Sequence, residues 1–368
     1  MYTGRIARFD GPGKPFEIET VALHDVGPGE ILVKVTRANI CGSDVHAWHG
    51  TFATRGLGGQ LPTVLGHEMV GAVEALGAGI STDSSGKPLQ PGARVVFPYF
   101  FCCHRCRNCL AGRRNGCLNL KMAMLGRADE PPYFVGGYAD YYLLPAGAVV
   151  YTVPDGVSDD IAAGANCALS QVMYGLERVD QQLGQTVLVQ GAGALGLYAV
   201  AVAKARGAAR VIALDGVPER LELALAFGAD DVIDITEVPD VKDRAKLVRK
   251  LTDGHGADVA VEVVGHPSAI DEGLKLLGQF GRYVEIGNIN IGKTFDFDPS
   301  RFVFGNKTMV GVSLYDPEVL ARALTFLEQH QDRLPLNRLA AACYSLDDIN
   351  EAFAAAEGKR DVRASIVP

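Results

Sequence analysis

Residues 186–196 have the sequence TVLVQGAGALG, an apolar strand-like run that ends in glycines spaced G-x-G-x-x-G. Gly191 permits a tight turn, Gly193 lets a pyrophosphate approach the backbone, and Gly196 allows the next helix to pack closely on the strand. Leu195 falls in the first turn of that helix, where free N–H groups bind anions. A simple glycine turn is the alternative, but the strand before it and the helix after it favour a dinucleotide site.

Short apolar runs continue to alternate with amphipathic helical stretches after this turn. Runs that are buried on both faces and separated by helices are typical of a doubly wound parallel sheet. The predicted strands are 186–190, 211–215, 231–233, 259–264 and 282–286, and the predicted helices are 195–206, 218–227, 241–251 and 268–277. This part of the chain is therefore expected to be an α/β domain.

An acidic residue, Asp215, ends the second predicted strand. Its carboxylate can accept hydrogen bonds from both ribose hydroxyls of an adenosine and would repel a 2′-phosphate, which favours NAD over NADP. The alternative role for Asp215 is a helix cap. Arg220 follows on the next helix and either points toward the adenosine ribose or is a solvated surface cation.

The N-terminal part of the chain has a different pattern. From residue 1 to about 153, short alternating segments such as 31–36 and 69–75 are separated by Gly/Pro turns, which predicts a β-rich lobe. Beyond residue 308, a strand at 309–313 and helices at 317–328 and 346–356 are expected to rejoin this lobe.

Cys103, Cys106, Cys109 and Cys117 are spaced C-x2-C-x2-C-x7-C. Thiolates at this spacing can converge on one tetrahedral cation, and four sulfurs leave no open position, so the predicted zinc is structural. Two disulfides are the alternative, which is disfavoured in a chain of 368 residues with eight cysteines and no secretory signal. Cys102 is interpreted as a bystander.

Composition excludes several classes of protein. The net charge of -8 and pI near 5.5 argue against a nucleic-acid-binding surface. No apolar run reaches membrane-spanning length and residues 1–6 carry no signal core, so we expect no membrane partner and a cytoplasmic location. The length and the 48% of hydrophobic residues suit two globular domains.

Two further motifs complete the pattern. Residues 66–77 match G-H-E-x2-G-x5-G, and residues 41–46 have the sequence CGSDVH. With these motifs, the cysteine-rich loop and the glycine turn in this order, the chain resembles the zinc-dependent medium-chain alcohol dehydrogenase family over essentially its whole length. The resemblance implies a GroES-like catalytic domain at 1–160 with a structural-zinc lobe at about 99–120. A Rossmann NAD-binding domain would follow at 161–306, with a return segment at 307–368 that completes the catalytic domain.

The resemblance also implies a catalytic zinc, and therefore two zinc ions per subunit. Cys41, His67 and Cys167 would be its ligands, and a Cys2His set leaves the fourth position for water or substrate. Glu68 would be a neighbour or transient ligand, and Asp44 would orient the ring of His67. Taken singly, the cysteines could be inert buried thiols and His67 a hydrogen-bonded core histidine.

By the same resemblance, the enzyme would transfer a hydride between an alcohol and the nicotinamide of NAD. Ser43 would take up the alcohol proton and pass it through the nicotinamide ribose to His46, whose ordinary pKa suits release to solvent. Ile286 would hold the nicotinamide carboxamide through its backbone, and Arg363 would contact the cofactor diphosphate.

Substrate and assembly are predicted more coarsely. Trp48, Phe52 and Tyr99 would line the pocket and favour a bulky or cyclic alcohol of low polarity, although they could equally be core aromatics. A polyol or amino-alcohol dehydrogenase, similar to sorbitol or threonine dehydrogenases, is the alternative within enzymes. A catalytically silent zinc-containing binding protein is the alternative of another class. The strand at 309–313 would pair with its copy, which predicts a homodimer or homotetramer.

Overall fold

The computed structural model of the chain describes residues 2–23, 25–51, 59–289, 291–340, 342–358 and 362–368. Two compact units make up the fold: Met1–Cys167 with Asp316–Pro368 form unit 1, and Ala168–Tyr315 form unit 2. Among the described residues, no helix has the length and apolar character needed to cross a membrane.

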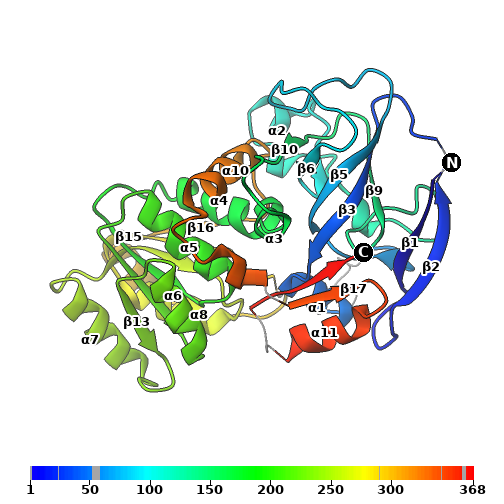
Figure 1. The fold of residues 1–368 in the computed structure, drawn as a ribbon. Helices are drawn as coiled ribbons and strands as arrows, with labels where there is room; N and C mark the ends of the chain where they lie inside the picture. The colour runs from blue at the N-terminus through cyan, green and yellow to red at the C-terminus, as the bar shows by residue number, and fades with distance from the viewer. Residues whose placement is uncertain (1, 24, 52–58, 290, 341, 359–361) are drawn as a thin grey trace. The chain divides into compact units, whose positions relative to one another are not determined.

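Unit 2 is built on one six-stranded parallel sheet with the order β13-β12-β11-β14-β15-β16 (Figure 1). This order places the first strand of the unit at the centre, as in a Rossmann fold. The strands are β11 (Thr186–Gln190), β12 (Arg210–Asp215), β13 (Asp231–Asp234), β14 (Ala257–Glu262), β15 (Leu277–Glu285) and β16 (Thr308–Gly311). The helices are α4 (Ser170–Arg178), α5 (Ala194–Ala205), α6 (Pro218–Ala226), α7 (Val241–Leu251), α8 (Pro267–Leu276) and α9 (Pro299–Phe304).

The central strands of this sheet are almost completely buried because helices cover the sheet. α5 packs against α4 and α6, and α7 packs against α8. Leu188, Ile212 and Ala260 are fully buried in the core that results. The doubly wound parallel sheet predicted from the sequence is thus confirmed, with most element ends displaced by a few residues.

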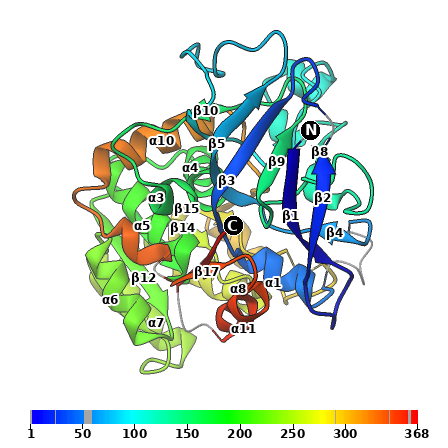
Figure 2. The same ribbon diagram turned by 45° about the vertical axis from the view of Figure 1, so that its right-hand side comes forward.

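Unit 1 is mainly antiparallel. Its main sheet has the order β10-β6-β5-β3-β18-β17, with β9 paired to β3, and a smaller sheet has the order β2-β1-β4. Figure 2 shows β1 beside β2 and β3 beside β5 and β9. The strands are β1 (Tyr2–Phe9), β2 (Glu17–Leu23), β3 (Ile31–Asn39), β4 (Thr63–Val64), β5 (Glu68–Leu76), β6 (Arg94–Val96), β9 (Tyr141–Leu144), β10 (Tyr151–Thr152), β17 (Ala342–Ser345) and β18 (Ala364–Val367). The β-rich lobe predicted from alternating segments and Gly/Pro turns is confirmed.

The remaining elements of unit 1 are helices, helical turns and two short strands. They are α1 (Gly42–Trp48), β7 (Phe100–Phe101), α2 (Arg107–Leu110), η2 (Arg114–Gly116), β8 (Lys121–Met122), η3 (Ala123–Leu125), α3 (Asp159–Ala162), the π-helical turn η4 (Ala165–Leu169), α10 (Val319–His330), η5 (Leu336–Ala340) and α11 (Ile349–Glu357). β7 and β8 pair with each other and frame the cysteine-rich loop.

One sequence prediction about the C-terminal part is corrected. The strand expected at 309–313 does not rejoin the β-rich lobe, because β16 pairs in parallel with β15 at the edge of the unit 2 sheet. The chain returns to unit 1 only from Asp316. There β18 pairs with β3 and closes the main sheet, so the return segment is shorter than expected.

Candidate active site

The four spaced cysteines lie together in unit 1. The Sγ atoms of Cys103, Cys106, Cys109 and Cys117 are all within 4.8 Å of one another. All eight cysteines of the chain are free thiols and none forms a disulfide bond. At Cys103, hydrogen bonds from the side chain of Asn119 and from backbone N–H groups lower the pKa of the thiol to about 5, whereas burial raises the pKa of Cys109 to about 12. A closed four-sulfur set of this kind fits a structural zinc ion.

Cys102 differs from its neighbours. Its Sγ donates a hydrogen bond to the carbonyl of Arg114 at 3.2 Å, and burial raises the pKa of the thiol to about 12. Because its sulfur is engaged with this carbonyl and is not part of the four-sulfur cluster, Cys102 fits the bystander role expected from the sequence.

A second group of donors converges in unit 1. One ligand atom each from Cys41, His67, Glu68 and Cys167 lies within 4.8 Å of the others. Cys41 caps α1, His67 immediately precedes β5, and Cys167 lies in the π-helical turn η4. Asn166 secures this turn, since its Nδ2 donates to the carbonyl of His67 at 3.1 Å. Sequence segments far apart thus meet at one centre.

Asp44 fixes the orientation of His67. Asp44 is fully buried, and its Oδ1 lies 3.2 Å from His67 Nδ1. Its Oδ2 accepts hydrogen bonds from the Cys41 N–H at 3.0 Å and from the Tyr138 hydroxyl at 2.9 Å. Because Nδ1 is engaged, Nε2 is the nitrogen left to bind a cation. Tyr138 was missed by sequence reasoning, since a fully buried tyrosine outside any motif gives no local signal.

Glu68 is neutralised inside the cluster. It is fully buried, and Arg363 Nη1 lies 2.6 Å from its Oε2. Burial raises the pKa of Glu68 to about 8, against the opposing charge of Arg363. The Arg363 side chain is itself buried within unit 1, a partnership that the sequence did not indicate. The expected contact between Arg363 and a cofactor diphosphate stays a prediction.

The electrostatics of the cluster suit a cation. A hydrogen bond from Cys167 and the positive charges of His67 and Arg363 hold the pKa of Cys41 well below its usual value, although burial opposes this. The same hydrogen bond and burial raise the pKa of Cys167. The two thiols therefore share one proton. Two sulfurs and one imidazole, with a carboxylate beside them, match the donor set of an open zinc site.

Of the other predicted site residues of unit 1, two border the cluster and two lie along helix α1. Ser43 Oγ lies 3.4 Å from His67 Nε2, and the ring of Tyr99 lies 4.7 Å from the His67 ring, so both border the cluster. His46 lies half-buried on α1. Trp48 ends the same helix and packs edge-on against Phe353 of α11, with ring centroids 5.6 Å apart. Phe52 lies outside the described residues.

The glycine turn of unit 2 has the geometry that a diphosphate needs. A Cβ at Gly196 would collide with the carbonyl oxygen of Gly191, so the helix packs as closely as the motif predicted. A Cβ at Gly193 would meet no described protein atom within 4 Å. Gly193 caps α5, and Leu195 lies in its first turn. The open backbone at Gly193 and the free N–H groups at the N-terminus of α5 are compatible with a bound anion, so the diphosphate site stays a prediction.

Asp215 lies beside this turn at the end of β12. Its Oδ2 accepts a hydrogen bond from the Ala192 N–H at 2.7 Å, and its Oδ1 accepts from the Gly216 and Val217 N–H groups at 2.8 and 3.0 Å. These hydrogen bonds hold the turns around Asp215 but do not cap α6, whose N-cap is Val217 without a side-chain cap, so the helix-cap alternative is not borne out. A carboxylate has further lone pairs for ribose hydroxyls. Arg220 is half-buried in the first turn of α6.

Ile286 is buried directly after β15, and its N–H donates to the carbonyl of Glu262 at 3.2 Å. This hydrogen bond holds the backbone at Ile286 against the end of β14.

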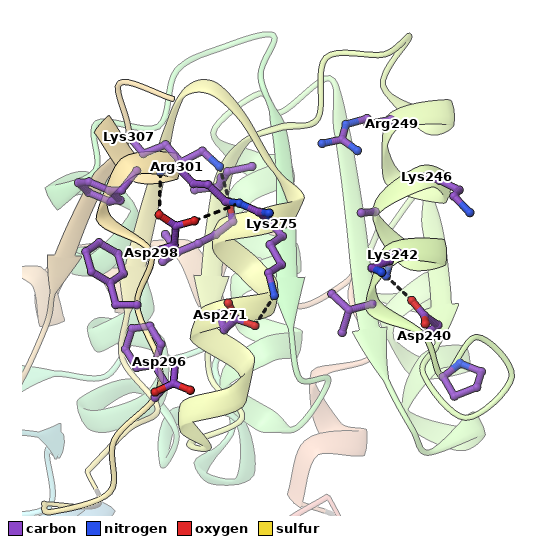
Figure 3. A pocket seen from close by; sticks show the side chains of 18 residues that line it. Asp240, Lys242, Lys246, Arg249, Asp271, Lys275, Asp296, Asp298, Arg301 and Lys307 are labelled. Atoms are coloured by element: carbon purple, nitrogen blue, oxygen red, sulfur yellow. Dashed lines mark hydrogen bonds and ion pairs between the residues drawn. The ribbon is translucent and has the colours of Figure 1, made fainter. Parts of the chain in front are cut away.

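A cavity of about 1000 Å³ lies elsewhere in unit 2, between α7, α8 and the segment around α9 (Figure 3). Two ion pairs lie in its lining: Lys275 contacts Asp271 at 2.5 Å, and Arg301 contacts Asp298 at 3.2 Å. Neither the glycine turn nor Asp215 is among the described residues that line it. The cavity is therefore separate from the dinucleotide turn.

Comparisons with known proteins agree with this geometry. Residues 27–155 match the model of the alcohol dehydrogenase GroES-like domain, and residues 194–329 match the zinc-binding dehydrogenase model. The chain is 34% identical to 5-exo-hydroxycamphor dehydrogenase of Pseudomonas putida, over 90% of each chain. It is 32% identical to erythritol/L-threitol dehydrogenase of Mycolicibacterium smegmatis, over 96% of this chain and 94% of that one. The crystal structure of an alcohol dehydrogenase from Thermotoga maritima superposes with a TM-score of 0.93 at 28% identity and covers 100% of both chains.

Proposed function

Since the chain belongs to the zinc-dependent medium-chain dehydrogenase/reductase family, we propose that it is an NAD-linked zinc alcohol dehydrogenase acting on a bulky or cyclic alcohol of low polarity. Its relatives together indicate an oxidoreductase that acts on alcohols. The observation that carries the proposal is the convergence of Cys41, His67 and Cys167 within 4.8 Å, with Asp44 holding the imidazole.

These three residues would hold the catalytic zinc, and the four cysteines of the 99–120 lobe would hold a second, structural ion. When bound, zinc supplies a Lewis acid that makes an alcohol hydroxyl far more acidic. Ser43, whose Oγ borders His67, would accept the hydroxyl proton as its own hydroxyl proton leaves toward His46 on the same helix, and His46 would release a proton to solvent. Arg363 forms an ion pair with Glu68 and so balances the charge of the carboxylate beside the proposed zinc ligands.

NAD would lie on the glycine turn of unit 2. Gly193 and the N-terminus of α5 hold its diphosphate, and Asp215 accepts the adenosine ribose hydroxyls. Ile286 holds the carboxamide end through its backbone. The preference for NAD over NADP rests on the charge of Asp215, which repels a 2′-phosphate.

Two observations favour a bulky, low-polarity substrate. The relative with 34% identity is named for hydroxycamphor, a bicyclic alcohol. The aromatic ring of Tyr99 packs beside the ligand His67 and gives the cluster an apolar wall. A polyol or amino-alcohol dehydrogenase is the second candidate, because other relatives are named for erythritol and threitol and for L-threonine.

The discriminating experiment is a panel of cyclic, linear, polyol and amino alcohols with NAD and with NADP, followed by nicotinamide absorbance. Highest kcat/KM for a cyclic alcohol with NAD supports the proposal, and highest kcat/KM for erythritol or threonine favours the second candidate. Metal analysis separates an enzyme from a silent binding protein. Two zinc ions per chain are expected for the enzyme, whereas one zinc ion with Cys41 freely alkylated would overturn it.

Self-association through β16 is part of the proposal. β16 is one of the two edge strands of the six-stranded sheet; its Met309 is exposed, and so are Val303 and Phe304 shortly before it. An edge strand with exposed apolar neighbours can pair with its copy across a two-fold axis, which gives a homodimer or a homotetramer.

A further inference from the structure

Two carboxyl groups meet at the ends of the strands beside the glycine turn. Glu262 is the last residue of β14 and Glu285 the last of β15, and the two are direct partners in the parallel register. Side chains in register on neighbouring parallel strands point to the same face of the sheet. Glu262 is fully buried, and Asn288 contacts both carboxyl groups.

Each carboxyl group also holds a loop. Glu262 Oε1 accepts hydrogen bonds from the N–H groups of Val264 and Gly265, both at 2.7 Å. Glu285 Oε1 accepts the N–H of Asn288 at 2.9 Å, and Asn288 Nδ2 lies 3.4 Å from Glu262 Oε2. The pair therefore joins the loop 263–265 after β14 to the loop 286–288 after β15.

These loops adjoin the proposed cofactor site. Glu262 is in register with Gln190, the last residue before the glycine turn, and the Val263 N–H donates to the Gln190 carbonyl at 3.0 Å. The loop 286–288 contains Ile286, which is expected to hold the nicotinamide carboxamide. In parallel α/β sheets, ligands bind at this end of the strands.

Electrostatics require a proton between the two groups. Glu285 Oε2 is buried and has no hydrogen-bond donor among the described residues, so an ionised pair would leave it unsatisfied beside a second negative charge. One shared proton satisfies Glu285 Oε2 and removes the repulsion. Burial, together with the Glu285 carboxyl, raises the pKa of Glu262 to about 8, even though the Val264 and Gly265 N–H groups oppose this.

Near neutral pH, the shared proton of the pair is the one that titrates, because the neighbouring ionisable groups are either neutral or ion-paired. Tyr283 of β15 faces both carboxyls, and burial raises its pKa further above its ordinary value, so it stays neutral. The charge of Glu272 on α8 also raises the pKa of Tyr283, and Glu272 is ion-paired with Arg244.

We propose that Glu262 and Glu285 form one singly protonated carboxyl pair that positions the loops 263–265 and 286–288, so that loss of the shared proton weakens cofactor binding. The inference rests on the proposed NAD-linked function. Glu262 and Glu285 are positioning residues, since they act through the loops. Above the pKa of the pair both groups are charged, and their repulsion separates the loops.

Binding of NADH, measured by fluorescence at several pH values, tests this pair. For the wild type, Kd rises by about tenfold between about pH 7 and about pH 9, because one bound proton is coupled to binding. In Glu262→Gln, the side-chain oxygen still accepts the loop N–H groups and the side-chain amide always donates to Glu285. The Kd of this variant for NADH therefore does not rise over this pH range. Glu285→Gln acts in the same way. The exposed Glu222→Gln of α6 removes the same charge from unit 2 and keeps the wild-type profile.

The thermal midpoint of the zinc-loaded protein without NADH gives a second measurement. Because the folded pKa is raised, the pair stabilises the fold below the ordinary glutamate pKa, and this contribution is lost as pH rises through about 8. Glu262→Gln removes that loss and leaves the zinc content unchanged. Identical pH profiles of the midpoint in wild type and Glu262→Gln overturn the pair. Failure of the wild type and of all variants to bind NADH, with the midpoint profiles still different, instead overturns the proposed cofactor.

Discussion

His67 Nδ1 lies 3.2 Å from Asp44 Oδ1, and both side chains are buried in unit 1. Asp44 also accepts the N–H of Cys41, so a single carboxylate positions two of the proposed zinc ligands. Asp44→Ala is expected to lower zinc affinity by about 10–100-fold, because the imidazole loses its orienting partner. Competition with a chelator measures this. Tyr138→Phe, which removes one donor to Asp44 but leaves the carboxylate, is the matched control and should lose much less affinity.

Cys41→Ala and His67→Ala are expected to abolish turnover and to lower the zinc content from two ions per chain to one. NADH binding should persist, because the glycine turn lies in unit 2. Metal analysis and fluorescence titration check both parts. The exposed Cys343→Ser serves as the control and should keep both ions. Full activity of Cys41→Ala would remove the proposed zinc centre.

Gly193→Ala and Gly196→Ala are expected to weaken NAD binding for different reasons. The Cβ at Gly196 collides with the carbonyl of Gly191, which should cost about 1–3 kcal/mol of stability as well as affinity. The Cβ at Gly193 meets no described protein atom within 4 Å, so the thermal midpoint should stay unchanged while the Kd for NADH rises. Tight NADH binding by Gly193→Ala would place the diphosphate elsewhere.

Ser43→Ala is expected to lower kcat strongly with little change in zinc content, because Ser43 borders His67 without belonging to the donor set. Steady-state kinetics and metal analysis check this. The half-buried Thr51→Val, beyond the end of α1, is the control. An unchanged kcat for Ser43→Ala would assign the proton transfer to another group.

Asp83 is expected to make unit 1 sensitive to acid. Burial opposes ionisation, but hydrogen bonds from Thr152, Ser85 and Lys87 lower its pKa to about 2. Since the folded pKa is depressed, its contribution of about 2 kcal/mol is present above the ordinary aspartate pKa and is lost as pH falls through about 2. Asp83→Asn should lower the free energy of unfolding near pH 7 by a similar amount. Denaturant unfolding at pH 7 and pH 3 checks this, and an equal loss at both values would contradict it.

Met309→Arg and Phe304→Asp are expected to convert the oligomer into monomers, because they place charge beside the edge strand β16. Light scattering after size-exclusion chromatography measures the mass. Leu183→Asp, on another exposed part of unit 2, should keep the wild-type mass. A monomeric wild type would remove the proposed pairing.

Local sequence patterns were sufficient to predict most elements of the fold. The strand 186–190 and its glycine turn depend on neighbouring residues, so their structure can be inferred from a short window. The strand at 309–313 was assigned to the wrong part of the fold, because the residues of a short strand do not indicate which strand it pairs with. Its place was decided by the register with β15.

The site was predictable only where a motif marks it. Cys41 and His67 stand in motifs, and the family resemblance supplied Cys167. The ion pair of Glu68 with Arg363 and the contact of Glu262 with Glu285 join residues from different parts of the chain. Such contacts arise from strand order and register, which single residues do not encode locally.

Cys167 is the last residue of the first segment of unit 1, whereas Arg363 lies in the final stretch of the chain. During synthesis on a ribosome, every sulfur and imidazole donor of the second cluster emerges before the dinucleotide-binding unit has been made. The guanidinium that balances Glu68 emerges only after the whole of unit 2. The proposed zinc ligands can therefore meet early in synthesis, whereas the charge of the neighbouring Glu68 stays unbalanced until unit 2 has been made.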